Sequence, residues 1–153
     1  YAHSGNRYPT VHQPWELVDP MAEWVVARGM KDIFAFDVAV SETPAGYQYA
    51  AIECNPRFNG ASYPTGIASK LNIPSWTSET FVTDLRSVQA LDLRDVEFDA
   101  QTNEGIILVN WGSIQTGKLA VLLAGSIEVQ DQLRTELKQR LSQTLTPAGQ
   151  PDP

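Results

Sequence analysis

Four polar side chains of complementary chemistry lie close together in the chain. Asp37 occurs within one apolar segment, and Glu53, Asn55 and Arg57 occur at the end of the next apolar segment and just beyond it. Carboxylate and amide oxygens are the ligands that Mg²⁺ prefers, and a guanidinium binds phosphate or carboxylate through two parallel hydrogen bonds. These are the residue types that a magnesium-bound polyphosphate requires.

Two segments rich in strand-forming residues, 33–40 and 47–53, must position these side chains. Residues 41–46 between them have the composition of a turn. The pattern predicts an antiparallel hairpin in which the numbers of opposed residues sum to about 90. Asp37 then lies opposite Glu53 or its immediate neighbour.

Strict alternation along the second strand places Glu53 and Asn55 on the same face as Tyr49 and Ala51. On the first strand, Asp37 shares its face with two small residues, Ala35 and Ala39. Small side chains would form the floor of a concave site, and carboxylates would form its walls. Because opposed carboxylates repel each other, we expect a positive group between them. The alternative is a solvated strand end followed by an ordinary Asn-Pro turn.

The segments Phe36–Val40 and Ile52–Pro64 resemble the C-terminal metal-binding strands of the ATP-grasp superfamily. This superfamily includes D-alanine ligases, carbamoyl phosphate synthetases, biotin carboxylases and peptide ligases. Its members use ATP to activate a carboxylate as an acyl phosphate, and an amine or another nucleophile then displaces the phosphate. The close resemblance covers residues 33–65.

Carried over by motif, the resemblance implies that Asp37, Glu53 and Asn55 bind Mg²⁺, as two ions if Glu53 bridges them. It implies that Glu53, Asn55 and Arg57 contact ATP, and that Arg57 is the catalytic residue at the transferring phosphoryl group or acyl phosphate. The activity implied is an ATP-dependent carboxylate-amine (or thiol) ligase that acts on small-molecule substrates. Within the superfamily, the Gly5-Asn6-Arg7 and Asn59–Ser62 segments resemble those of the amino-acid and peptide ligases.

The resemblance implies an α/β (α+β) fold, namely the C-terminal half of an ATP-grasp fold with an antiparallel sheet flanked by helices. We expect this lobe to span residues 1–145 and a flexible tail to span residues 146–153. The chain starts at Tyr1, without an initiating methionine, in what reads as the middle of a longer sequence, so we expect a fragment that lacks the N-terminal ATP-grasp lobe and is inactive alone. None of its lysines lies in a glycine-rich phosphate loop.

Other elements follow from periodicity. We expect an amphipathic helix over 14–28 with Trp15 and Trp24 in the core, a helical stretch over 79–91, a second hairpin of 105–111 and 118–124, and a helix from Ser126. Cys54 is expected to be a buried core thiol.

Two loops supply candidate substrate contacts. His3 and Arg7 lie in an N-terminal segment expected to be a loop, where they would recognise a carboxylate. Asn59 and Ser62 lie in a segment dense in small residues, 59–66, whose backbone would cradle phosphate or the acyl substrate. The alternative in both cases is a solvated or turn-forming role.

Composition limits the class of function. The net charge of -7 argues against a nucleic-acid surface, and no stretch approaches the roughly twenty apolar residues of a membrane span. A single cysteine favours a reducing compartment, so we expect a cytoplasmic protein. Two rivals to the ligase remain: a catalytically inactive ATP-grasp-like lobe that binds nucleotide or is structural, and a metal-dependent hydrolase, which lacks a general-base histidine beside the carboxylates.

Overall fold

The computed structural model describes residues 5–143, and these divide into two compact units. The hairpin unit consists of residues 10–63. The sheet unit consists of residues 5–9 and 64–143 among those described. The predicted tail, 146–153, lies outside the described residues. The fold is mixed α/β, with antiparallel sheets and flanking helices, as the sequence predicts.

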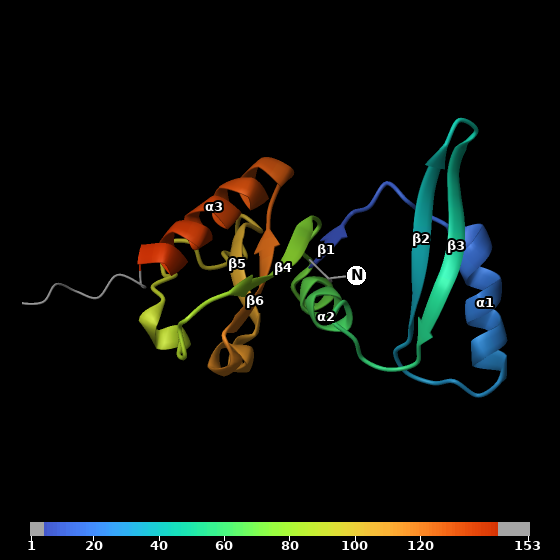
Figure 1. Ribbon diagram of the computed structural model, residues 1–153, viewed down its shortest axis with the longest axis horizontal. Helices are drawn as coiled ribbons and strands as arrows, with labels where there is room; N and C mark the ends of the chain where they lie inside the picture. Colours follow the sequence, from blue (N-terminus) through green and yellow to red (C-terminus); the bar gives the residue numbers. More distant parts are fainter. Residues whose placement is uncertain (1–4, 144–153) are drawn as a thin grey trace, which may run out of the picture. The chain divides into compact units, whose positions relative to one another are not determined.

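The hairpin unit contains helix α1 (Trp15–Ala27) and the antiparallel strands β2 (Ala35–Thr43) and β3 (Gly46–Asn55) (Figure 1). The predicted hairpin is therefore confirmed. Its turn closes because the Thr43 hydroxyl donates to the Gly46 carbonyl at 2.8 Å and accepts from the Ala45 N–H at 3.3 Å. Gly46 has a backbone φ of 113°, which residues other than glycine rarely adopt.

The sheet unit is built on four antiparallel strands in the order β1-β4-β6-β5. The strands are β1 (Gly5–Tyr8), β4 (Trp76–Val82), β5 (Gly105–Asn110) and β6 (Lys118–Ala124). Helix α2 (Ser62–Leu71) begins at the end of the hairpin unit and packs on one face of this sheet through Ala68, and α3 (Ile127–Gln143) packs on the other face through Leu137 and Leu141. Short 3₁₀ turns occupy Val88–Ala90 and Trp111–Thr116.

Two of the predicted elements are wrong. The segment over 79–91, predicted to be helical, instead contains most of β4 and one 3₁₀ turn. The N-terminal segment, predicted to be a loop, contains β1. Gly5 allows β1 to lie against β4, since a Cβ at this position would be 1.7 Å from the Ser78 carbonyl oxygen. The second hairpin and the helix after Ser126 are confirmed.

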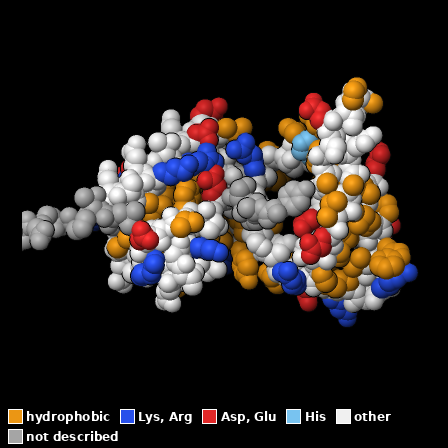
Figure 2. All heavy atoms as spheres, in the orientation of Figure 1, with side chains coloured by type: hydrophobic (Ala, Val, Ile, Leu, Met, Phe, Trp, Pro, Cys, Tyr) orange, Lys and Arg blue, Asp and Glu red, His pale blue; other side chains and the backbone are white. Residues whose placement is uncertain are grey.

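The two units differ in how many of their hydrophobic side chains are buried. The sheet unit has a hydrophobic core in which Leu119 and Val121 to Ala124 are fully buried. In the hairpin unit, all of whose residues are described, Asn55 alone is more than nine-tenths buried. Trp15 and Trp24, predicted to lie in the core, are 59% and 58% exposed. Hydrophobic side chains gather on the visible surface of this unit (Figure 2).

Among residues 5–143, no helix combines the length and the apolar character needed to cross a membrane.

Candidate functional site

Asp37 and Glu53 lie directly opposite each other in the β2–β3 ladder. Two residues further from the turn, Ala35 lies opposite Asn55. Since opposed residues of an antiparallel pair share a face, both carboxylates and the Asn55 amide belong to one face of the hairpin. The predicted juxtaposition of these three side chains is therefore confirmed, and we call this face the site face.

A β-bulge produces this arrangement. Val38 pairs with Ala51 and Asp37 pairs with Glu53, so that Ile52 is one extra residue in β3. The bulge shifts the alternation of β3 by one position. Tyr49 and Ala51 therefore lie on the face opposite to Glu53, and the predicted grouping of these residues with Glu53 is wrong.

The site face carries small and polar residues toward the turn, where Ala39 pairs with Ala50 and Ser41 pairs with Gln48. Asp37, Glu53, Ala39 and Ala50 are all exposed. The small residues predicted beside Asp37 thus form an open floor. A ligand that reached the two carboxylates would meet little steric obstruction from the hairpin itself.

Helix α1 covers the other face of the hairpin. Phe36 and Cys54, an opposed pair, line an apolar cleft together with residues of this helix, namely Pro20, Met21, Trp24 and Val25. Figure 1 places α1 beside β3. Cys54 is exposed at the mouth of this cleft, so the prediction of a buried thiol is wrong. His12 contacts Tyr47 and Tyr49, which lie on this same covered face.

Asn55 connects the site to the body of the hairpin unit. The residue is 7% exposed, and its Nδ2 lies 3.4 Å from Asp37 Oδ2, a contact longer than the usual range of about 2.7–3.2 Å for an N–H···O hydrogen bond. The contact directs the amide N–H toward Asp37. Within the described residues no group donates to the amide oxygen, so that oxygen is available to an incoming ligand.

Arg57 lies two residues beyond β3 and is exposed. Its Nη1 donates to the Phe58 carbonyl at 3.2 Å. Among the residues that the structure describes, it forms no ion pair with Asp37 or Glu53. The three oxygen-bearing side chains are brought together, whereas the guanidinium keeps N–H groups that no residue within 5–143 engages.

The candidate substrate contacts have different surroundings. The Asn59 Oδ1 accepts from the backbone N–H groups of Ala61 and Ser62 at 3.0 and 3.1 Å, and the Asn59 N–H donates to Ser62 Oγ at 3.0 Å. This reciprocal pattern is that of a capping box at the start of α2. The oxygens of both side chains therefore stabilise a helix end. Arg7 is an exposed residue of β1 opposite Thr77, and His3 lies outside the described residues.

The oxygen donors of the site face, Asp37, Glu53 and Asn55, fit a Mg²⁺ ion that also binds phosphate oxygens. Two carboxylates and one amide are hard oxygen donors of the kind that Mg²⁺ binds, and Mg²⁺ commonly completes its octahedron with water and substrate phosphate. Across residues 5–143, no group of three or more His, Cys, Asp or Glu side chains is arranged to hold a metal ion by itself. The residues therefore fit a metal ion that arrives with phosphate oxygens better than a metal held by protein ligands alone.

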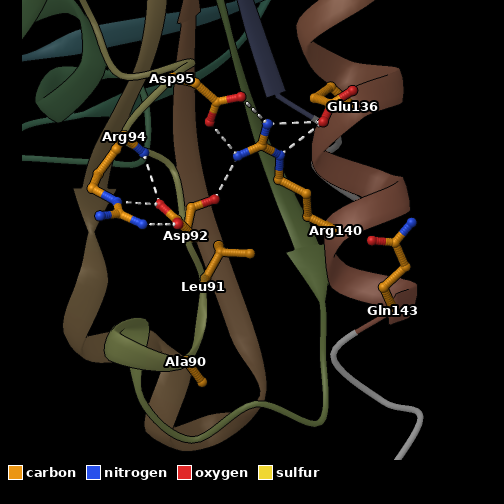
Figure 3. Close-up of a pocket in the computed structure, with 8 residues that line it drawn as sticks. All are labelled: Ala90, Leu91, Asp92, Arg94, Asp95, Glu136, Arg140 and Gln143. Carbon is orange, nitrogen blue, oxygen red and sulfur yellow. Dashed lines mark hydrogen bonds and ion pairs between the residues drawn. The ribbon is translucent and has the colours of Figure 1, made fainter.

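A second polar cluster lies in the sheet unit. The Arg140 guanidinium on α3 binds both carboxylate oxygens of Asp95 at 2.7 Å, Glu136 at 2.8 Å and the Asp92 carbonyl at 2.6 Å (Figure 3). These hydrogen bonds lower the pKa of Asp95 below its ordinary value. Because its charges are already paired, the cluster ties α3 to the segment over 91–95. A contact this distant along the chain leaves no spacing signal in the sequence.

Comparison of the chain with protein-family models, with curated proteins and with solved structures finds no match.

Proposed function

We propose that this chain is part of an ATP-grasp carboxylate-amine (or thiol) ligase and that the site face of the hairpin binds the magnesium of Mg-ATP. The observation that carries the proposal is the direct opposition of Asp37 and Glu53, with Asn55 beside them on an open face. The resemblance of residues 33–65 to ATP-grasp metal-binding strands supports the same assignment.

The electrostatics of the pair support a cation. Carboxylates placed directly opposite each other in a ladder repel, and neither Asp37 nor Glu53 forms an ion pair with any residue in the described part of the chain. A divalent cation between them would convert this repulsion into attraction. The small residues Ala39 and Ala50 leave room beside it for a bulky anionic ligand.

Each residue has a proposed role. Asp37, Glu53 and Asn55 hold the metal through their oxygens, and Arg57 binds the phosphoryl group being transferred, where its planar fork matches phosphate oxygens. Bound Mg²⁺ would neutralise the charge that develops on the phosphates. Catalysis of phosphoryl transfer consists mainly of such positioning and charge stabilisation.

The reaction proposed has two steps. A substrate carboxylate attacks the terminal phosphorus of ATP, which releases ADP and gives an acyl phosphate, and an amine or thiol then displaces phosphate. The lysines and the adenine contacts that a nucleotide needs are assigned to a second, N-terminal lobe. A cytoplasmic location, proposed on the single Cys54, agrees with the use of ATP.

Metal titration tests the proposed site directly. The free Mn²⁺ signal in electron paramagnetic resonance measures binding of Mn²⁺ as a substitute for Mg²⁺, with and without ATP. We expect Asp37→Asn and Glu53→Gln to weaken binding at least tenfold, in line with the loss of metal-site residues. Glu42→Gln is the matched control, because Glu42 is an exposed carboxylate of the same hairpin opposite Tyr47 on the covered face. Equal binding by all four proteins would refute the proposed site.

One observation favours a second function, an ATP-grasp-like lobe that binds nucleotide without catalysis. The Arg57 guanidinium bonds to a neighbouring carbonyl instead of lying against the carboxylates. Phosphate release from ATP by the intact protein, measured with a panel of acids and amines, separates the two functions. Release that depends on an acid indicates the ligase, and Mn²⁺-ATP binding without release indicates the inactive lobe. The hydrolase alternative is weaker still, because His12 contacts the covered face and not the site face.

A further inference from the structure

The hairpin has two competing registers, and only one of them forms the site. From the turn to Val38 and Ala51 the ladder is regular. Without the bulge, the same ladder would continue with Ile52 opposite Asp37 and Glu53 opposite Phe36. Glu53 would then lie on the face that α1 covers, and Asp37 would have no carboxylate across from it.

The bulge lowers the stability of the hairpin, and a favourable contact elsewhere must offset this loss. The extra residue leaves one position unpaired and disrupts the ladder locally. The offsetting gain lies at the apolar cleft, which is lined by Phe36 and by residues of α1. In the observed register Cys54 occupies the position opposite Phe36, and in the unbulged register Glu53 would occupy it. A thiol behaves as a small hydrophobic group that covers apolar surface of the cleft, whereas a carboxylate at this exposed position would leave that apolar surface in contact with water.

From this competition we infer that Cys54 is a positioning residue: its contact with the apolar cleft of α1 selects the bulged register that places Glu53 opposite Asp37. The inference rests on the proposed metal site for its functional meaning. The register itself is a property of the hairpin and is measured without any metal. It also explains why an exposed thiol lines the same cleft as Met21 and Trp24.

The test replaces the thiol by a charge. In Cys54→Lys, the cleft faces a charged side chain in either register, so the unbulged ladder prevails, and the introduced ammonium group would then lie on the site face near Asp37. We expect the cross-strand backbone NOE between residues 37 and 53 to be lost and Mn²⁺ binding to weaken at least tenfold. The neutral control Cys54→Val keeps an apolar group in the cleft, and we expect it to retain both the NOE and the affinity.

A rescue variant distinguishes positioning from general damage. Deletion of Ile52 lets the regular ladder continue from the turn with Glu53 already opposite Asp37, so the register no longer depends on Cys54. Combining this deletion with Cys54→Lys should restore both the NOE and Mn²⁺ binding. If the combined variant stays impaired, or if Cys54→Lys alone keeps the NOE between residues 37 and 53, the inference is overturned.

A further variant adds no charge and therefore does not threaten folding. In Glu53→Leu, the larger apolar side chain should occupy the cleft in place of Cys54, which favours the unbulged register. We therefore expect a cross-strand backbone NOE between residue 53 and Phe36. Persistence of the NOE between residues 37 and 53 in this variant also overturns the inference. Absence of Mn²⁺ binding by the unaltered chain would instead count against the proposed function, while the register measurements would still decide the role of Cys54.

Discussion

The Nδ2 of Asn55 lies 3.4 Å from the Oδ2 of Asp37, and Asn55 is the most buried residue of the hairpin unit. An exposed carboxylate in an open sheet normally samples several rotamers. A buried amide that directs its N–H toward one of the two oxygens favours the rotamers that keep this contact. Outer partners of this kind commonly contribute tenfold to a hundredfold in metal affinity.

We therefore expect Asn55→Ala to weaken Mn²⁺ binding at least tenfold, because the variant loses both a proposed ligand oxygen and the contact that orients Asp37. The measurement is the same paramagnetic resonance titration. Asn59→Ala is the matched control, since Asn59 caps α2 and makes no contact with Asp37 among the described residues. Equal losses in the two variants would mean that the effect is on folding and not on the site.

Glu53→Gln should have opposite effects on stability in the absence and presence of metal. Without metal, removing one of two opposed charges relieves repulsion, and we expect the free energy of unfolding to rise by about 0.2–1 kcal/mol. With saturating Mg²⁺ and ATP, the unaltered chain gains stability by ligand binding, whereas the variant gains less. Thermal unfolding at low ionic strength, with and without Mg²⁺ and ATP, checks both parts. A variant that is less stable under both conditions would contradict the expected repulsion.

Arg57→Lys separates phosphate recognition from metal binding. Lysine keeps the charge but loses the planar fork that binds two oxygens at once. We expect affinity for Mg-ATP to fall roughly tenfold, which corresponds to about one charge-assisted hydrogen bond. Affinity for Mn²⁺ alone should not change, because the guanidinium does not contact Asp37 or Glu53 within the described residues. Calorimetric titration with each ligand makes the comparison, and a parallel loss of Mn²⁺ affinity would place Arg57 in the metal site instead.

The hairpin was predictable from sequence because its signals are local. Two apolar strand segments and a turn with Pro44 and Gly46 specify both the strands and an approximate register. That approximate register places Asp37 opposite Glu53 or its immediate neighbour, and the bulge determines that the residue is Glu53. The bulge at Ile52 was not predictable by alternation, because it depends on which side chain meets the apolar cleft of α1.

Long-range packing explains the other differences. The 79–91 segment has apolar residues at helical spacing, yet β4 forms there because it pairs with both β1 and β6. β1 could not be recognised as a strand for the same reason, since four residues form a strand only beside a partner. Trp15 and Trp24 follow a helical apolar pattern, but the hairpin unit is too thin to bury either ring, even though Trp24 lines the cleft beside Phe36.

The ion pair between Arg140 and Asp95 predicts how stability depends on pH. The hydrogen bonds from Arg140 lower the pKa of Asp95, and those from Arg94 lower the pKa of Asp92. A carboxyl whose pKa is depressed on folding stabilises the protein at pH values above its unfolded pKa of about 4. This stabilisation is lost as the pH falls below that value and through the folded pKa.

We therefore expect the free energy of unfolding of the chain, measured by urea titration, to decrease as the pH falls from about 5 to 2. Asp95→Asn should be less stable than the unaltered chain at pH 7 and should show a shallower decrease over the acid range, because the variant carboxamide has no proton to bind. Asp84→Asn is the control, since Asp84 is exposed and forms no ion pair in the described residues. Parallel pH profiles for Asp95→Asn and the unaltered chain would show that the bond between α3 and the 91–95 segment does not contribute to stability in solution.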